Sequence, residues 1–163
     1  MMFKKLILFL LVVVVLAGCG EDYIYQDSHP FAQAGWTYAD SLQFDFEIAD
    51  TSKRYNLLLT IHHTPDYPYE NLYVKFATIF PKGQAALHGS NRVEQITSLQ
   101  LARKEGSWLG QCSSEECELT IPIQTNTWFP NPGQYSLHIA QYMRQDSLVD
   151  VKAIDFAIQE NKK

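Results

Sequence analysis

The stretch Leu42-Gln43-Phe44-Asp45-Phe46-Glu47-Ile48 alternates apolar and polar side chains at every position. Successive side chains of a β-strand point to opposite faces, so this alternation predicts a strand with one face in a core and the other in water. A polar turn at residues 50–53 follows, and residues 55–64 (YNLLLTIHHT) are then apolar on both faces. Such a run is typical of a central strand that is covered on both sides. The two segments together indicate a β-sheet protein.

Further short runs of the same kind continue to the end of the chain, separated by turns rich in glycine, proline, asparagine and aspartate. They cover residues 72–80, 96–101, 119–123, 135–141 and 149–158. We find no apolar stripe of helical length at the i, i+3, i+4, i+7 spacing. The pattern therefore predicts an all-β chain, an antiparallel β-sandwich of about seven or eight strands, Ig-like or jelly-roll-like, over residues 35–160. A closed, soluble β-barrel is the alternative, and no repeat or second domain is visible.

The first residues resemble a targeting signal. Lys4 and Lys5 precede a fully apolar run of eleven residues, 6–16. This run is shorter than the roughly 20 residues of a membrane-spanning helix, but it fits the apolar region of a secretory signal peptide behind a positively charged start. We therefore expect residues 1–18 to be a cleaved signal peptide.

The residues around the expected cleavage site, Leu16-Ala17-Gly18-Cys19, resemble the lipobox of bacterial lipoproteins. In that motif the cysteine is acylated on sulfur, by palmitate for example, and becomes the mature N-terminus. An ordinary signal peptide with an unrelated cysteine at its end is the alternative. Each buried lipid methylene contributes about 0.8 kcal/mol, so two or three acyl chains on Cys19 would hold the protein on a membrane without spanning it. Residues 19–34 are then the lipidated N-terminus and a tether, with at most an edge strand at 23–25.

Composition and charge limit the function classes. Of 163 residues, 46% are hydrophobic, 13% aromatic and 19% charged, which is typical of a globular protein. The net charge is −5, and it becomes −7 when the leader with its two lysines is removed. Phosphate binding needs clustered Lys and Arg, so we expect no nucleic-acid partner.

Two cysteines remain in the expected mature chain beside Cys19. Cys112 and Cys117 bracket the polar loop Ser-Ser-Glu-Glu, and disulfides persist in exported proteins. We expect these two cysteines to pair. A metal site is the alternative, but it needs two further ligands that the spacing does not supply.

Residues that could carry catalysis are few. His62 and His63 are adjacent, and on a strand they would point to opposite faces and could not chelate one ion. We expect one of them to be hydrogen-bonded in the core or at its rim and the other to be exposed. The carboxylates of Glu115 and Glu116 fit a solvated turn, and no P-loop, Rossmann, H-E-x-x-H or G-x-S-x-G pattern occurs. We therefore expect no enzyme, metal or cofactor.

The segment of residues 66–71 (DYPYEN) suggests a recognition loop. Tyrosines on a proline-stiffened loop offer a large contact area at a low cost in conformational entropy. Asp66, Tyr67, Tyr69 and Asn71 are accordingly candidate interface residues, the alternative being that both rings cap the edge of the sandwich. Trp108 and Trp128 lie near turns, and for them we favour closure of the core at the ends of the sandwich over recognition.

Several segments in order resemble the gliding-motility lipoprotein H (GldH) family of Bacteroidetes. The most specific are Tyr67-Pro68-Tyr69-Glu70-Asn71-Leu72-Tyr73 and Gln141-Tyr142-Met143-Arg144. The others are Leu16-Ala17-Gly18-Cys19, Gly35-Trp36, residues 42–44, residues 55–57 and 61–64, residues 106–110, and Gly133-Gln134-Tyr135.

The resemblance implies a cell-envelope lipoprotein that assists gliding motility and the associated type IX secretion apparatus, without known catalytic residues. We therefore expect a non-enzymatic protein, anchored in the outer membrane through Cys19, that contacts other envelope lipoproteins or machinery proteins. The side of the membrane stays open, although Glu21 and Asp22 resemble the surface-export signals of such lipoproteins. A carbohydrate- or ligand-binding sandwich, with exposed Trp and Tyr rings as stacking platforms, is the alternative.

Overall fold

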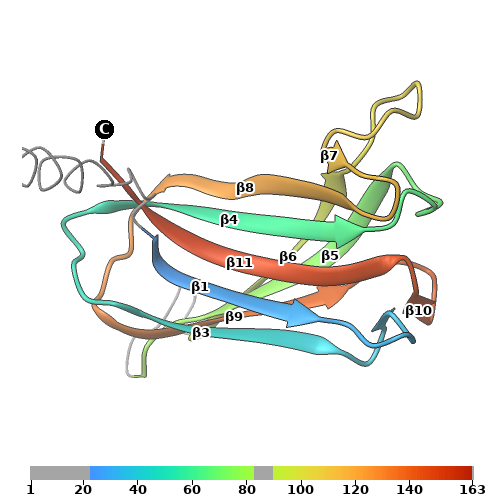
Figure 1. The fold of residues 1–163 in the computed structure, drawn as a ribbon. Helices are drawn as coiled ribbons and strands as arrows, with labels where there is room; N and C mark the ends of the chain where they lie inside the picture. Colours follow the sequence, from blue (N-terminus) through green and yellow to red (C-terminus); the bar gives the residue numbers. More distant parts are fainter. Residues whose placement is uncertain (1–22, 83–89, 163) are drawn as a thin grey trace, which may run out of the picture.

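The computed structural model describes residues 23–82 and 90–162, which form strands and their connections (Figure 1). Within these residues no helix is long and apolar enough to cross a bilayer. The expected signal peptide and Cys19 lie outside the described residues. The strands are β1 (Tyr23–Pro30), β2 (Trp36–Thr37), β3 (Ser41–Ile48), β4 (Arg54–His63), β5 (Asn71–Ile79), β6 (Arg92–Gln100), β7 (Gln111–Cys112), β8 (Cys117–Thr127), β9 (Gly133–Gln141), β10 (Ser147–Leu148) and β11 (Val151–Asn161).

The strands form two packed antiparallel sheets, which confirms the predicted sandwich. One sheet has the order β1-β11-β4-β8-β7 and the other β3-β9-β5-β6, while β2 and β10 pair separately. When only the eight longer strands are numbered along the chain, these orders become 1-8-3-6 and 2-7-4-5. That is the arrangement of a jelly roll, one of the two predicted topologies.

The predicted alternation sets the core. In β3 the burial pattern alternates at every residue, with Leu42, Phe44 and Phe46 facing inward. The same three positions pair with Ile139, Leu137 and Tyr135 of β9, so apolar side chains meet apolar neighbours across the sheet. The strand β4 is central in its sheet, between β11 and β8, as its apolar sequence predicts. Its inward residues are buried, and its outward residues after the exposed Arg54 are half-buried by their neighbours.

The strand β1 is longer than expected, because it extends from Tyr23 to Pro30 and pairs with β11 along this length. The sheet thus includes half of the segment, residues 19–34, that was assigned above to a tether. The polar residues 26–28 hid the strand in the sequence, since its stability comes from pairing with β11 and from the rings of Tyr25 and His29. Those rings pack on Phe46 at 5.8 Å and on Phe44 at 4.8 Å between ring centroids.

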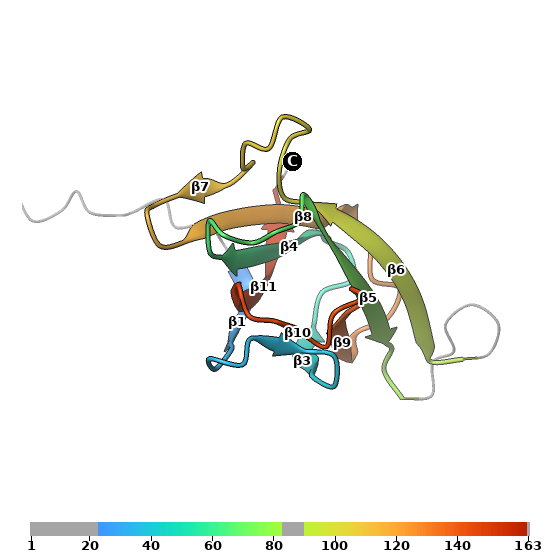
Figure 2. The same cartoon turned by 90° about the vertical axis from the view of Figure 1, so that its right-hand side faces the viewer.

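The two ends of the sandwich differ. We call the end where β1 begins the entry end; the chain also finishes there, as Figure 1 shows on its left side. The opposite end, which Figure 2 shows from the front, carries β2, β10 and the longer connections, and we call it the distal end. At the distal end Gly35 has a φ of +73° and its Cα lies against the backbone of Leu148, so a side chain there would collide with that strand.

Candidate functional site

The loop between β4 and β5 holds the four candidate interface residues, but it does not present all of them. Tyr67 is only 3% exposed and belongs to the core. Its hydroxyl donates a hydrogen bond to the carbonyl of Asn71 at 3.2 Å, and burial raises its pKa. Asp66 is exposed, whereas Tyr69 and Asn71 are half-buried. The Tyr67 ring therefore closes the sandwich, the alternative considered for it above, and is not available to a partner.

Tyr67 is part of an aromatic cap at the distal end. The cap consists of His63, Tyr67, Tyr69 and Trp108. The Trp108 ring meets the His63 ring at 4.5 Å between centroids, and the Tyr67 ring lies 5.6 Å from His63. Trp108 thus helps to close the core. Trp128 does not, because 54% of it is exposed and its indole N–H donates to the Thr51 carbonyl at 3.0 Å.

The histidine pair splits between the two faces of β4. His63 is 1% exposed, its Nδ1 lies 2.8 Å from the Thr64 carbonyl, and burial lowers its pKa. The His62 ring lies on the outer face, with Nδ1 at 2.7 Å from a Glu116 oxygen and Nε2 at 2.7 Å from an Asp155 oxygen. Burial lowers the pKa of His62, but the hydrogen bonds and charges of the two carboxylates outweigh it, so the net pKa is raised.

Through these contacts His62 links neighbouring segments of the chain. Carboxylates accept hydrogen bonds and do not donate them, so the two contacts favour an imidazolium that donates from both nitrogens. Ser28 Oγ donates to Asp155, the same carboxylate that contacts His62. The cluster links β1, β4, β11 and the β7–β8 loop. Among the described residues no group of three or more His, Cys, Asp or Glu side chains is placed to hold a metal ion.

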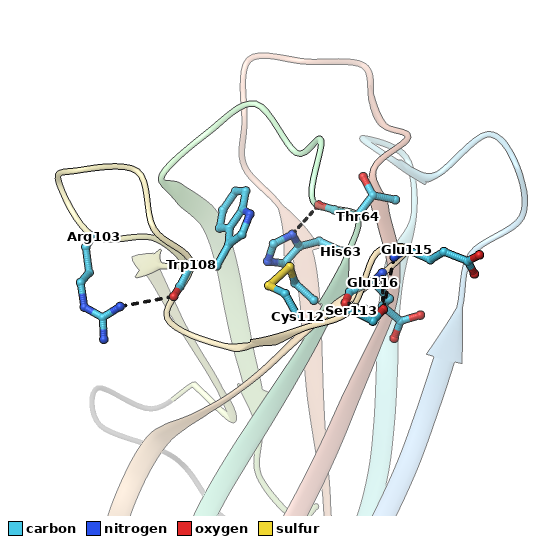
Figure 3. Close-up of a disulfide and its surroundings, with 9 residues drawn as sticks. His63, Thr64, Arg103, Trp108, Cys112, Ser113, Glu115 and Glu116 are labelled. Carbon is cyan, nitrogen blue, oxygen red and sulfur yellow. Dashed lines mark hydrogen bonds between the residues drawn. A yellow bond between two sulfur atoms is a disulfide. The ribbon is translucent and has the colours of Figure 1, made fainter.

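The β7–β8 hairpin lies beside the aromatic cap (Figure 3). In the structure a disulfide joins Cys112 to Cys117 across the loop. Ser113 Oγ accepts the backbone N–H of Glu115 and of Glu116 within that loop. These bonds hold the loop in a shape that directs the Glu116 carboxylate toward His62.

Three exposed apolar side chains gather on the outer face of the β3-β9-β5-β6 sheet, and we call them the tyrosine surface. They are Tyr73 (43% exposed), Ile96 (51%) and Tyr142 (45%). Ile96 of β6 pairs directly with Lys75 of β5, and Lys75 is two residues from Tyr73 on the same face. Ile96 and Tyr73 therefore both point outward, on neighbouring strands. The backbone N–H of Tyr142 donates to the Tyr73 carbonyl at 2.8 Å. The tyrosine surface lies toward the distal end, where β5 begins and β9 finishes.

A buried amide anchors this surface. Gln141 is 1% exposed; its Nε2 donates to the Gln145 carbonyl at 2.8 Å and its Oε1 accepts the N–H of Met143 at 2.9 Å. The Met143 sulfur in turn lies 3.2 Å from the backbone nitrogen of Tyr73. The structure therefore joins the segments 67–73 and 141–144, far apart in sequence, into one supported surface.

Sequence reasoning did not single out Tyr142, Ile96 or Tyr73 as an interface. For Tyr73 the signal is the alternation of faces along a strand. It lies between Leu72 and Val74, which are both fully buried in β5, so its side chain points outward. Ile96 and Tyr142 carry no comparable signal, since their outward direction depends on how β6 and β9 pair with β5.

The comparisons with known proteins agree with the resemblance seen in the sequence. A model of the GldH lipoproteins matches residues 23–158. The chain belongs to the GldH lipoprotein family. The matched residues comprise every described strand except the last three residues of β11.

Two named proteins of this kind are similar to the chain over most of its length. The gliding motility lipoprotein GldH homolog of Christiangramia forsetii is 23% identical over 143 residues, which cover 88% of this chain and 83% of the relative. The gliding motility lipoprotein GldH of Flavobacterium johnsoniae is 24% identical over 140 residues, which cover 86% and 82%. Membership thus associates this chain with membrane-attached lipoproteins and with gliding motility.

Among solved structures the chain is similar to one of empty-head Turnip Yellow Mosaic Virus. The match covers 93% of this chain and 88% of the viral chain, at 11% sequence identity and a TM-score of 0.30. At that score the similarity carries no argument about fold or function.

Proposed function

We propose that this GldH-family chain is a non-enzymatic lipoprotein, anchored in the outer membrane through acyl chains on Cys19, that supports gliding motility or type IX secretion by binding other envelope proteins. The tyrosine surface is the observation that carries the proposal. Large aromatic side chains that are half-exposed on a rigid support are the residues that most often dominate protein interfaces. Gln141 and Met143 supply that support from beneath.

The position of the tyrosine surface fits an anchored protein. The described chain starts with β1 at the entry end, four residues after Cys19, whereas Tyr73 lies near the start of β5 and Tyr142 just after β9, both toward the distal end. At about 3.3 Å per residue those four residues reach only about 13 Å, so an acyl anchor on Cys19 would keep the entry end close to the membrane. The tyrosine surface would then point toward neighbouring proteins.

The binding proposal is tested by the double variant Tyr142→Ser with Ile96→Ser, expressed as the full chain in cells that lack the native gene. Loss of two central interface side chains is expected to cost about 2 kcal/mol or more, which weakens binding roughly 30-fold. We expect less crosslinked partner, lower levels of neighbouring envelope lipoproteins and impaired secretion. Ile24→Ser is the matched control, because Ile24 is 44% exposed but lies at the entry end.

Normal secretion and normal levels of all neighbouring envelope lipoproteins after deletion of the gene would contradict a supporting role. Equal crosslinking by the double variant and by Ile24→Ser would instead reject the tyrosine surface as the interface. The anchor is tested separately by Cys19→Ala, which should move the chain out of the outer-membrane fraction.

A ligand-binding role is the second candidate. It is favoured by one observation, a cleft between β6 and β8, whose occupant is considered next.

A further inference from the structure

The two sheets do not meet along the β6–β8 margin of the sandwich. β6 is the last strand of its sheet, and β8 is flanked on this side only by the two residues of β7. Between them lies a cavity of about 790 Å³, which we call the edge cleft. This volume is within the range of about 300–1,000 Å³ that small-molecule sites occupy. The margin is visible at the upper right of Figure 2.

The floor of the edge cleft is the core itself, including Phe46 and Leu137. The wall on β8 is formed by Leu119, Ile121 and Ile123, which are partly buried. Val93, Leu109 and Trp128 stand at its opening with 41%, 39% and 54% of their surfaces exposed. Three of the large exposed apolar side chains of the molecule therefore surround one cavity, a pattern that marks a binding site more often than chance exposure does.

The edge cleft is lined by uncharged side chains. None of the described residues that line it is Asp, Glu, Lys, Arg or His. Its polar groups are hydroxyls and amides, such as those of Thr97 and Gln95, which bond to each other at 2.9 Å. A charged ligand would lose its hydration there without a compensating partner. The lining therefore fits an uncharged, apolar ligand.

A peptide strand fits the edge cleft less well than a hydrocarbon chain does. A peptide brings a backbone N–H and C=O at every residue, and the apolar side chains of the β8 wall offer them no partner, so that only the free backbone edges of β6 and β8 could pair with them. The edge of β8 is also interrupted by Pro122, which lacks an N–H, and by Asn126, which has a φ of +53°. A sugar would bury hydroxyls against the same apolar wall. An acyl chain brings no group that needs a hydrogen bond.

The dimensions agree with an acyl chain. Residues 119–124 and Thr127 of β8 line the edge cleft, and at the rise of a strand the stretch from Leu119 to Thr127 spans roughly 25 Å. One lipid tail reaches across half of the hydrocarbon core of a bilayer, about 15 Å. Trp128 lies just after β8 at the entry end, so the opening beside it would face a membrane if Cys19 is the anchor. That orientation rests on the proposed function, whereas the edge cleft and its lining do not.

We propose that the edge cleft binds one acyl chain of a lipid that comes from outside the protein, with the uncharged part of its headgroup at the Gln95 and Thr97 rim. The buried hydrophobic side chains of the described structure all lie between Trp36 and Ile158. A chain that begins at Gly20, without leader or acyl group, therefore keeps the whole described core and can be used for the test.

The experiment titrates this chain with the neutral probe N-phenyl-1-naphthylamine and follows its fluorescence. We expect saturable binding at one site per chain and displacement by 1-palmitoylglycerol. Thr97→Trp fills the edge cleft from β6 and should weaken probe binding at least tenfold. Glu94→Trp adds the same side chain on the same strand but on the opposite face, where Glu94 pairs with Ala77, and should leave binding unchanged. Circular dichroism checks that both variants fold.

The outcomes separate the occupants. Absence of saturable binding to the unaltered chain overturns the proposal without touching the proposed interface or anchor. Equal binding by Thr97→Trp and Glu94→Trp also overturns it, as does displacement by an oligosaccharide or a strand-forming peptide but not by the lipid. If the lipidated full chain fails to bind the probe while the chain from Gly20 binds it, the acyl chain on Cys19 fills the edge cleft and the external source is wrong.

Discussion

The two long margins of this sandwich, where β1 faces β3 and where β6 faces β8, differ in how well side chains fill the gap between the sheets. At the β1–β3 margin, aromatic rings bridge the sheets, since Tyr25 packs on Phe46 and Phe156 with ring centroids 5.8 Å and 6.0 Å apart. At the β6–β8 margin the inward side chains of β6 include Gln95 and Thr97, which bond to each other. Packed sheets lie about 10 Å apart, a gap that a ring spans and a threonine does not. Margin closure therefore depends on side-chain length more than on strand pairing.

Truncation of one buried side chain at each margin gives the largest expected difference. Phe156 is fully buried among the rings of Tyr25, Phe44 and Phe46, so Phe156→Ala should lower the free energy of unfolding by about 3–5 kcal/mol. Ile121 already borders a cavity and is only partly buried, so Ile121→Ala should cost about 1 kcal/mol. Urea unfolding of the chain from Gly20 measures both. Equal losses would show that the β6–β8 margin is as tightly packed as the other.

The disulfide should have the next largest effect, because it holds the start of β8 beside the open margin. On the chain-entropy estimate, closing so short a loop stabilises the folded state by about 2 kcal/mol. The variant Cys112→Ser with Cys117→Ser should lose about that much in urea unfolding while keeping its folded circular dichroism spectrum. A thiol assay on the folded, unaltered chain should find neither sulfur reactive. Two reactive thiols at these positions would refute the pairing.

A smaller effect is expected at the distal end, in the aromatic cap. Tyr67→Phe keeps the ring but removes the hydroxyl that bonds to the Asn71 carbonyl, at a cost of about 1 kcal/mol. Asn71 begins β5, the neighbour of β6, so the loss should be local to the open side of the sheet. Hydrogen exchange should show faster opening near the start of β5 and unchanged protection in β1. Faster exchange in both strands would mean that the cap supports the two margins alike.

Prediction from the sequence succeeds where the pattern within one strand is enough to determine its structure and burial. The alternation at residues 42–48 predicts β3 and its inward face, and the apolar run that follows predicts a central β4. It fails where distant residues decide. Tyr67 is buried because His63 and Trp108 pack against it, and the sequence separates Trp108 from Tyr67 by about forty residues.

The structure at the two margins also depends on residues that are distant in the sequence. The polar residues 26–28 conceal β1, whose partner β11 is at the far end of the chain. The edge cleft depends on β6 facing β8 without pairing to it, a relation between two sheets that strand patterns do not encode. The tyrosine surface likewise depends on the register of β5 with β6 and β9. Its residues could be read as exposed only once that register was known.

The smallest expected effect concerns neither margin but the outer face between them, and it depends on pH. The pKa of His62 is raised in the folded chain, mainly through Asp155 and Glu116, so the folded state holds this proton more tightly than the unfolded state. His62 therefore adds stability below its ordinary value of 6.5, and this contribution is lost as the pH rises through the folded value. His63 acts in the opposite direction, because burial lowers its pKa and its neutral form is the stable one.

His62→Gln removes the first contribution and leaves the second. The difference in unfolding free energy between the unaltered chain and this variant should be larger at about pH 5.5 than at about pH 8.5, by urea unfolding at each pH. Thr60→Val is the control on the same face, since it removes only the hydrogen bond between the Thr60 and Thr120 hydroxyls and adds no titratable group. A pH-independent difference for His62→Gln, like that expected for Thr60→Val, would show that the two carboxylates do not hold a charged imidazole. The His62 ring that links β4, β11 and the β7–β8 loop would then be neutral in the folded chain.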